Sequence, residues 1–135
     1  MIPIKQRRSS KVKKALGKYK SLFEKSVAEK IGEDYEYEPD RLPFTQPAKK
    51  RSYTPDFKIG DKTYIECKGL FSSEDRAKML WVREQHPDVI FYILFQNSNV
   101  KIRKGSKKSY GDWATENGFQ WADYRNGIPK GWFST

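Results

Sequence analysis

The spacing of apolar positions along the chain predicts both helices and strands. Phe23, Val27 and Ile31 recur at intervals of four residues, which places them on one side of a helix. Two further segments open on a serine that can cap a helix, and they close before Pro87 and at Gly118. Helices are therefore expected over residues 21–31, 73–85 and 109–118.

Strands are expected where apolar and polar residues alternate, or where apolar residues run without interruption. YEYE at residues 35–38 alternates, and residues 53–68 form two arms around a turn at Gly60 and Asp61. Residues 89–95 are rich in β-branched and aromatic side chains, which is typical of a strand covered on both faces. The aromatic residues of FQWADY and IPKGWF, near the end of the chain, are expected to cover an edge of the sheet.

The order of these elements predicts an α/β fold with a mixed sheet. Strand 63–68, helix 73–85 and strand 89–95 form a candidate βαβ unit, in which a right-handed crossover joins two parallel strands. The hairpin adds antiparallel pairing to that unit. Three prolines and a basic cluster in residues 39–51 predict an extended connector instead of a helix.

Charge is distributed unevenly along the chain. The formal net charge is +10, and residues 1–20 contain eight Lys or Arg without an acidic residue. Without those eight, 19 of the 27 basic residues remain against 17 acidic ones, so the rest of the chain is nearly neutral. The chain is therefore interpreted as a basic arm, residues 1–20, and a single domain, residues 21–135. This balance favours a polyanionic partner, with nucleic acid first and an anionic membrane surface second.

Three basic segments are candidates for contact with DNA: the arm, the connector and a loop at residues 100–108 that holds five Lys or Arg. A solvated surface is the alternative interpretation for each segment. Contacts with phosphate would be independent of base sequence. The candidate DNA-binding residues are Lys11, Lys13, Lys14, Lys18, Lys20, Lys49, Lys50, Arg51, Lys101, Arg103, Lys104, Lys107 and Lys108.

Composition argues against several other classes of protein. Cys67 is the only cysteine, so no disulfide can form within the chain, and a reducing compartment such as the cytoplasm is expected. No apolar run reaches the roughly 18 residues that a membrane span needs. The cysteine and histidine spacing is not that of a zinc site, and no small-molecule cofactor is expected. His86 is expected at a helix end and not in catalysis.

Charged residues in the hairpin are the candidates for catalysis. Side chains alternate along the second arm, so Glu66 and Lys68 share one face, and Ile65 and Cys67 share the other. A two-residue turn would place Asp56 opposite Ile65, whereas a three-residue loop would place it opposite Glu66. The second register would bring two carboxylates to about 5 Å apart, with Lys68 one pleat away.

Two carboxylates at that distance repel each other unless a cation lies between them. Oxygen ligands without His or Cys side chains favour Mg²⁺, for which Mn²⁺ is the expected substitute. Lys68 could then orient or deprotonate a water molecule, or stabilise charge on a phosphate. This set of groups is suited to hydrolysis of a phosphodiester. The alternative is an exposed Glu66–Lys68 ion pair, with Asp56 as an ordinary polar residue near a turn.

The same residues carry a resemblance to a known family. Pro55-Asp56, nine intervening residues and Glu66-Cys67-Lys68 match the PD…ExK signature of the restriction-endonuclease-like nuclease superfamily. That short pattern is weak by itself. Over about residues 18–132, however, the chain resembles the bacteriophage endonuclease I family, the phage Holliday-junction resolvases, through KSLFEKSVAEK, YEYE, SYTPDF, YIECKGLFSSEDRAKMLWVREQHPD, KGSKKSYGDW and NGFQWAD.

The resemblance implies a restriction-endonuclease-like mixed sheet flanked by helices, in a domain-swapped homodimer. It implies metal-dependent cleavage of branched DNA in recombination, above all four-way junctions, leaving 5′-phosphate and 3′-hydroxyl ends in the host cytoplasm. Residues 43–52 would be the connector that bridges the exchanged halves. The implied catalytic residues are Glu24, Asp56, Glu66 and Lys68, and the implied metal ligands are Asp56, Glu66 and the backbone carbonyl of Cys67, with Glu24 as a candidate ligand of a second metal.

Other interpretations remain open at the level of sequence. Glu24 has the spacing to complete a capping box with Ser21, which would be a purely structural role. A nuclease of the same fold could act on mismatched, nicked or single-stranded DNA instead of junctions. A non-catalytic basic module that coats DNA or RNA would also carry this charge. Metal-dependent cleavage of DNA would distinguish either kind of nuclease from a non-catalytic module.

Overall fold

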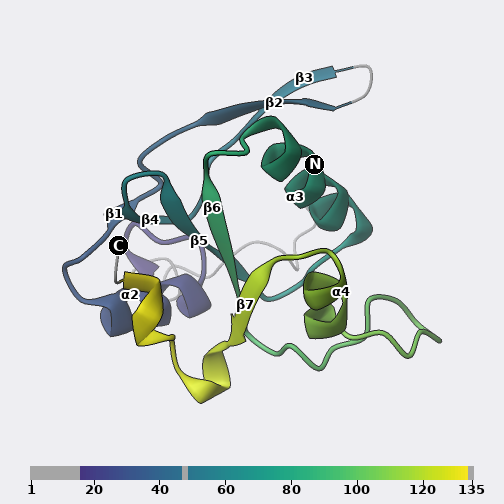
Figure 1. Ribbon diagram of the computed structural model, residues 1–135. Coiled ribbons are helices and arrows are strands. Elements are labelled where there is room, and N and C mark those ends of the chain that lie inside the picture. The colour runs from purple at the N-terminus through teal and green to yellow at the C-terminus, as the bar shows by residue number, and fades with distance from the viewer. Residues whose placement is uncertain (1–15, 47–48, 134–135) are drawn as a thin grey trace, which may run out of the picture.

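The computed structural model describes residues 16–46 and 49–133. Within these residues, the centre is a five-stranded mixed sheet of order β1-β4-β5-β6-β7 (Figure 1). β4 pairs antiparallel with β1 and β5, whereas β6 pairs parallel with β5 and β7. The expected α/β class, with a parallel pair beside an antiparallel hairpin, is thus confirmed. The strands are β1 (Glu36–Tyr37), β4 (Phe57–Gly60), β5 (Thr63–Lys68), β6 (Ile90–Phe95) and β7 (Gln120–Asp123).

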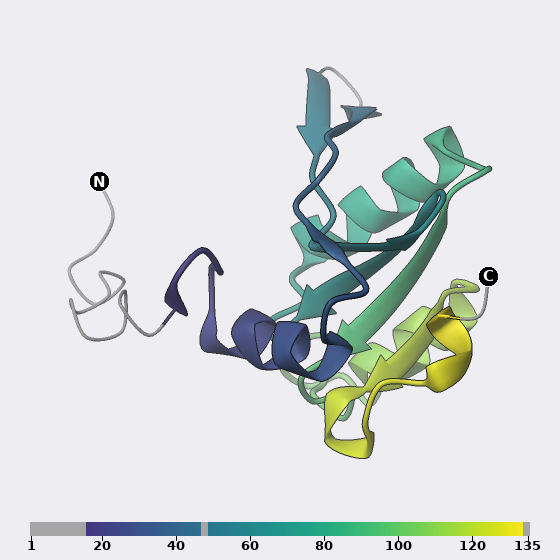
Figure 2. The ribbon, with the colours of Figure 1, turned by 90° about the vertical axis from the view of Figure 1, so that its left-hand side faces the viewer.

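In the described part of the chain, three α-helices flank this sheet. Ser72 and Ser109 each close a capping box with the acidic residue three positions later, and these boxes begin two of the helices. One helix lies on one side of the sheet and two lie on the other (Figure 2). They are α2 (Leu22–Ile31), α3 (Ser73–Gln85) and α4 (Tyr110–Glu116), and two short 3₁₀ helices, η2 (Tyr124–Asn126) and η3 (Lys130–Phe133), follow β7.

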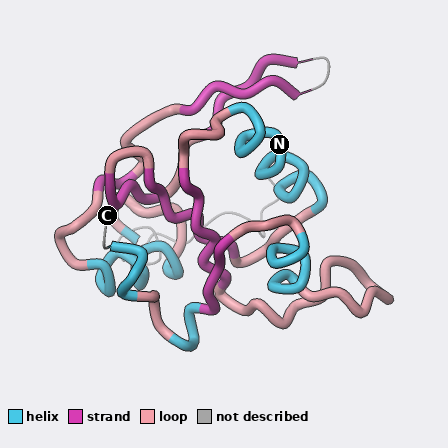
Figure 3. Tube along the Cα trace, in the orientation of Figure 1, coloured by secondary structure: helices cyan, strands magenta, loops and turns pink. Residues whose placement is uncertain are grey.

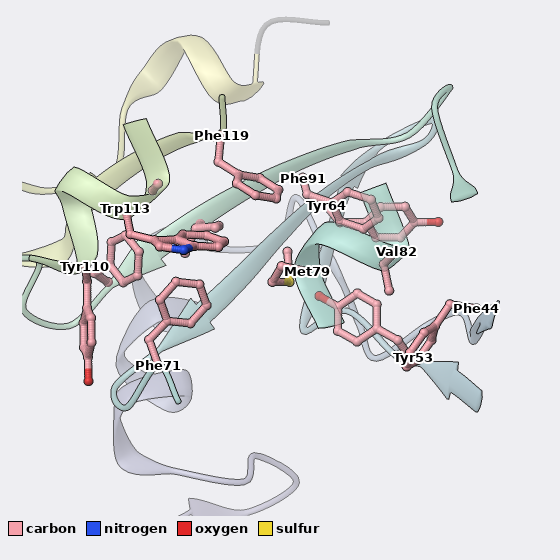
Figure 4. Close-up of a cluster of buried hydrophobic side chains, with 13 residues drawn as sticks. Phe44, Tyr53, Tyr64, Phe71, Met79, Val82, Phe91, Tyr110, Trp113 and Phe119 are labelled. Carbon is pink, nitrogen blue, oxygen red and sulfur yellow. The ribbon is translucent and has the colours of Figure 1, made fainter. Parts of the chain in front are cut away.

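Two apolar clusters hold these layers together, and β6 contributes to both. Phe91, Ile93 and Phe95 point into a first cluster with α3 and α4 (Figure 4). Tyr92 and Leu94 point the opposite way, into a second cluster with α2 and η3. The strand is therefore covered on both faces, as its uninterrupted apolar run predicts.

The aromatic residues near the end of the chain do not cover a sheet edge, and that expectation was wrong. Residues 120–123 form the edge strand β7 themselves. The ring of Trp132 instead covers a face of the sheet, where it stacks on Tyr92 with centroids 4.5 Å apart. A strand of four residues has too short a pattern to be predicted from periodicity.

The described residues of the expected connector, 43–46 and 49–52, are extended but pair with each other. β2 (Leu42–Gln46) and β3 (Lys49–Tyr53) form a separate two-stranded sheet, seen at the top of Figure 3. The Gln85 side chain of α3 accepts from the backbone N–H of Thr45 at 2.5 Å and donates to its carbonyl at 2.8 Å. Only the backbone of residues 49–51 is described, and Lys11, Lys13 and Lys14 lie outside the described residues.

Candidate active site

Asp56 and Glu66 lie on the same side of the β4–β5 hairpin. The pairing of Phe57 with Ile65 fixes Asp56 opposite Glu66. This is the register expected for a three-residue loop, although an irregularity near the end of β4 shortens the turn itself. The acidic side chains therefore converge, as one of the two alternative registers predicted.

Backbone hydrogen bonds join the two carboxylates. The N–H of Cys67 donates to Oδ2 of Asp56 at 2.8 Å, and the N–H of Asp56 donates to Oε1 of Glu66 at 3.3 Å. Nζ of Lys68 lies 3.3 Å from Oε2 of Glu66. Asp56, Glu66 and Lys68 are only 4% to 9% exposed, whereas Ile65 and Cys67 face the second apolar cluster. An exposed surface ion pair is thus the wrong description of these residues.

Glu24 reaches the same place from the first turn of α2. Oγ of Ser21 accepts from the backbone N–H of Glu24 at 3.0 Å, so Ser21 caps the helix. The Glu24 carboxylate does not complete a capping box, because it accepts a hydrogen bond from the hydroxyl of Tyr37 at 2.7 Å. Together with the hairpin residues, Glu24 lines a pocket of about 350 Å³.

Glu38 belongs to this acidic cluster and was missed in the sequence. Carboxylate oxygens of Glu24, Glu38 and Asp56 lie within 4.8 Å of one another. Glu38 directly follows β1, and its N–H donates to the carbonyl of Asp56 at 3.0 Å. Nζ of Lys20 lies 2.8 Å from Oε2 of Glu38. YEYE was predicted to be a strand, but its pairing with β4, which brings Glu38 to Asp56, was not foreseen.

The crowding of these carboxylates shifts their proton equilibria. Burial raises the pKa of Asp56 far above its usual value, and the charges of Glu66 and Glu24 raise it further. Burial also raises the pKa of Glu24. Burial lowers the pKa of Lys68, but the carboxylates of Glu66 and Asp75 more than compensate, so this pKa is raised overall. The pocket therefore favours added positive charge.

The donor set of the pocket fits a divalent cation. The carboxylates of Glu24, Asp56 and Glu66 line it, and carboxylate oxygens of Glu24, Glu38 and Asp56 lie within 4.8 Å of one another. Hard oxygen donors of this kind suit Mg²⁺ or Mn²⁺. The thiol of Cys67 packs with apolar side chains, and burial raises its pKa well above the usual value, so thiolate chemistry is disfavoured. The ammonium groups that line the pocket are those of Lys20, Lys68 and Lys78.

Similarity to known proteins agrees with this geometry. A family model described as phage endonuclease I matches residues 5–135. The chain belongs to the phage endonuclease I family. It is 38% identical over 120 residues to "Endonuclease I" of Escherichia phage T7, which covers 87% of this chain and 79% of that protein. It is 39% identical over 108 residues to "Endodeoxyribonuclease 1" of Enterobacteria phage T3, and this match covers 78% of this chain and 71% of that protein.

Membership of the phage endonuclease I family confirms the resemblance found in the sequence. It makes the chain a member of a family of nucleases, enzymes that hydrolyse phosphodiester bonds, and the acidic pocket lies within the matched residues. None of the helices in residues 16–46 and 49–133 is long and apolar enough to span a bilayer.

Basic side chains of this family member lie both in the pocket and on a loop. The loop of residues 100–108 precedes α4 and appears as an extended pink segment in Figure 3. Lys108 is half-buried and lies 2.5 Å from Glu116, so it is already paired. Lys18 is exposed over the ring of Tyr19, and Lys20 lies in the acidic pocket itself. The exposed cations of the loop are Lys101, Arg103, Lys104 and Lys107.

Proposed function

We propose that this chain is a divalent-metal-dependent DNA endonuclease that resolves four-way junctions and other branched DNA, leaving 5′-phosphate ends. The observation that carries the proposal is the buried convergence of Asp56 and Glu66 beside Lys68. Buried carboxylates that repel each other are costly unless a cation or a catalytic role accounts for them. Membership of the phage endonuclease I family supplies the matching reaction class.

The pocket residues would hold Mg²⁺, with Mn²⁺ as a substitute. Asp56, Glu66 and the backbone carbonyl of Cys67 would be ligands, and Glu24 would serve a second ion if two are bound. Glu38 is within reach of the same position. When bound, such an ion polarises a phosphate oxygen and lowers the pKa of a coordinated water.

The protein's own groups would set up the reaction. The N–H of Cys67 orients the Asp56 carboxylate, and the hydroxyl of Tyr37 orients that of Glu24. Lys68 has a raised pKa and is therefore an ammonium at neutral pH. An ammonium cannot accept a proton, so Lys68 is better suited to stabilising negative charge on the phosphate than to deprotonating a water.

Selectivity for junctions would arise from shape and charge in a homodimer. The basic arm and the exposed cations of residues 100–108 provide phosphate contacts that are independent of base sequence. Two such surfaces at a fixed angle in a dimer would suit a branch point better than a straight duplex. Residues 43–52 would open from the hairpin into a bridge between exchanged halves, and Glu24 of one chain would then complete the site of the other.

A cleavage assay tests this proposal. A labelled four-way junction, a linear duplex of the same sequence, and nicked, mismatched and single-stranded versions are each incubated with the protein in Mg²⁺ or in EDTA. We expect nicks near the branch with Mg²⁺ only, and slower cutting of the linear control. Preferred cutting of another substrate would redirect the proposal to that substrate. Tight junction binding without cleavage in any metal would contradict the enzyme assignment.

A further inference from the structure

Tyr53, the last residue of β3, has a buried hydroxyl that lacks a hydrogen-bond partner among the described residues. The residue is only 4% exposed. Burying a hydroxyl without a partner costs free energy, and such groups are rare in folded proteins. The position of this one calls for a physical explanation.

Tyr53 lies at the acidic pocket, and its ring packs against neighbouring side chains. Tyr53 lines that pocket together with Glu66 and Asp56. Its ring packs 6.1 Å from the ring of Phe91, and Nζ of Lys78 lies 5.2 Å from its centroid. In Figure 4 the hydroxyl points away from the neighbouring Phe44. Burial and the charges of Glu66 and Asp56 raise the pKa of Tyr53 well above its usual value, so the hydroxyl keeps its proton.

The carboxylate of Glu66 can accept a hydrogen bond from this hydroxyl. Both polar contacts of the Glu66 carboxylate are long: Oε1 accepts from the N–H of Asp56 at 3.3 Å, and Oε2 lies 3.3 Å from Nζ of Lys68. A shorter hydrogen bond from the hydroxyl of Tyr53 would therefore add to the contacts that fix this carboxylate. Metal-ligating carboxylates are usually fixed by hydrogen bonds from outside the coordination sphere.

We propose that Tyr53 is a positioning residue of the metal site, whose hydroxyl donates to the carboxylate of Glu66 when a divalent cation is bound. The bond fixes one oxygen of Glu66 and directs the other toward the cation. The inference rests on the proposed metal-dependent function, and it assigns Tyr53 no contact with DNA or with the reacting atoms. It also accounts for the placement, beside the Glu66 carboxylate, of a buried hydroxyl that has no hydrogen-bond partner within residues 16–46 and 49–133.

Substitution of Tyr53 by phenylalanine separates this role from a purely structural one. We expect Tyr53→Phe to weaken Mn²⁺ affinity about 10- to 100-fold in calorimetry, the range for loss of an outer-shell partner. In EDTA its unfolding midpoint should equal or exceed that of wild type, because the substitution removes an unsatisfied group. In cleavage, the Mg²⁺ concentration for half-maximal rate should rise by a similar factor, with the rate at saturating Mg²⁺ reduced far less.

Tyr64 provides the matched control. It is also 4% exposed, and its ring stacks on the same Phe91 at 6.0 Å. Its hydroxyl, however, donates to Oδ2 of Asp40 at 2.8 Å, away from the pocket. Tyr64→Phe should therefore lower the unfolding midpoint in EDTA and leave Mn²⁺ affinity unchanged.

The outcomes distinguish this inference from the proposed function. If wild-type protein binds no Mn²⁺ by calorimetry and shows no metal-dependent cleavage, both fail together. If wild type binds Mn²⁺, Glu66→Gln does not, and Tyr53→Phe binds as tightly as wild type, the metal site stands and the role of Tyr53 is overturned. If Tyr53→Phe lowers the unfolding midpoint in EDTA as much as Tyr64→Phe, the hydroxyl already has a partner without metal and the inference is wrong.

Discussion

Nζ of Lys68 lies 3.5 Å from Oδ1 of Asp75, the residue whose other oxygen closes the capping box of α3. Asp75 thus has two roles: it caps a helix, and it shares the ammonium of Lys68 with Glu66. The first turn of the helix that follows β5 therefore contacts a residue of the acidic pocket. Lys68, at only 9% exposed, is positioned between two acidic partners.

Asp75→Asn should reduce cleavage without unfolding the protein. Asparagine keeps an oxygen that can accept from the N–H of Ser72, but it carries no charge to hold Lys68. We expect kcat on a junction to fall about tenfold, equivalent to about 1.4 kcal/mol, with KM for DNA nearly unchanged. Single-turnover cleavage at saturating Mg²⁺, together with urea unfolding, measures both effects.

Asp112→Asn is the control for helix capping. Asp112 occupies the same position in the capping box of α4 and lies outside the acidic pocket. Its substitution should leave kcat at the wild-type value. Equal losses of activity in the two variants would mean that capping, and not the contact with Lys68, explains the effect of Asp75→Asn.

Glu66→Ala should separate DNA binding from cleavage. Most contacts with DNA are expected to be to phosphate through basic side chains, so junction affinity in a gel-shift assay should change by no more than a few-fold. Cleavage should fall by more than about 100-fold, beyond the usual cost of losing an outer-shell group. Cleavage at the wild-type rate would refute the assignment of Glu66 as a metal ligand.

Mixed dimers test the exchange of halves between chains. Glu24→Ala and Glu66→Ala subunits are refolded together, and dimers containing one of each are isolated by two affinity tags. If Glu24 of one chain completes the site of the other, each mixed dimer has one intact site and one site with both defects. We therefore expect nicking to return in mixed dimers. Mixed dimers that stay as inactive as the two parents would argue that each site is built within one chain.

Local sequence signals identified most of the fold, because caps and continuous apolar runs act over a few residues. Ser72 and Ser109 begin the helices that their spacing predicts, and Asp56 opposes Glu66 in one of the two expected registers. Glu38 was missed because its role depends on which strand β1 pairs with. The contact of Asp75 with Lys68 was missed because helix capping alone explains an acidic residue at this position. Only the packing of α3 reveals the contact.

Asp56→Asn should stabilise the metal-free protein at neutral pH. The folded-state pKa of Asp56 is raised by burial and by neighbouring carboxylates. A group with a raised folded pKa contributes its full stability below its unfolded pKa of about 3.9, and loses it as pH rises toward the folded value. We expect a gain of roughly 1 kcal/mol at pH 7 to 8 in EDTA, shrinking toward zero near pH 4. Urea unfolding across this range measures it, and a gain independent of pH would contradict the charge-based explanation.

Neutralising the exposed cations of residues 100–108 should reduce the salt dependence of junction binding. Each phosphate contact contributes about 0.9 to the slope of log affinity against log salt concentration. Changing Lys101, Arg103, Lys104 and Lys107 to glutamine should therefore lower the magnitude of that slope by about 3 to 4, if all four contact phosphate. Fluorescence anisotropy in EDTA, where cleavage is prevented, gives the slope directly.

The matched control for this loop is a pair of exposed lysines elsewhere, Lys30 on α2 and Lys130 on η3. Replacing both by glutamine lowers the net charge but should change the slope far less, because a direct contact releases counterions and a distant charge does not. A loop variant whose slope matches wild type, with unfolding also unchanged, would show that DNA does not contact this loop. Equal slope changes per charge in the loop and control variants would assign the effect to net charge.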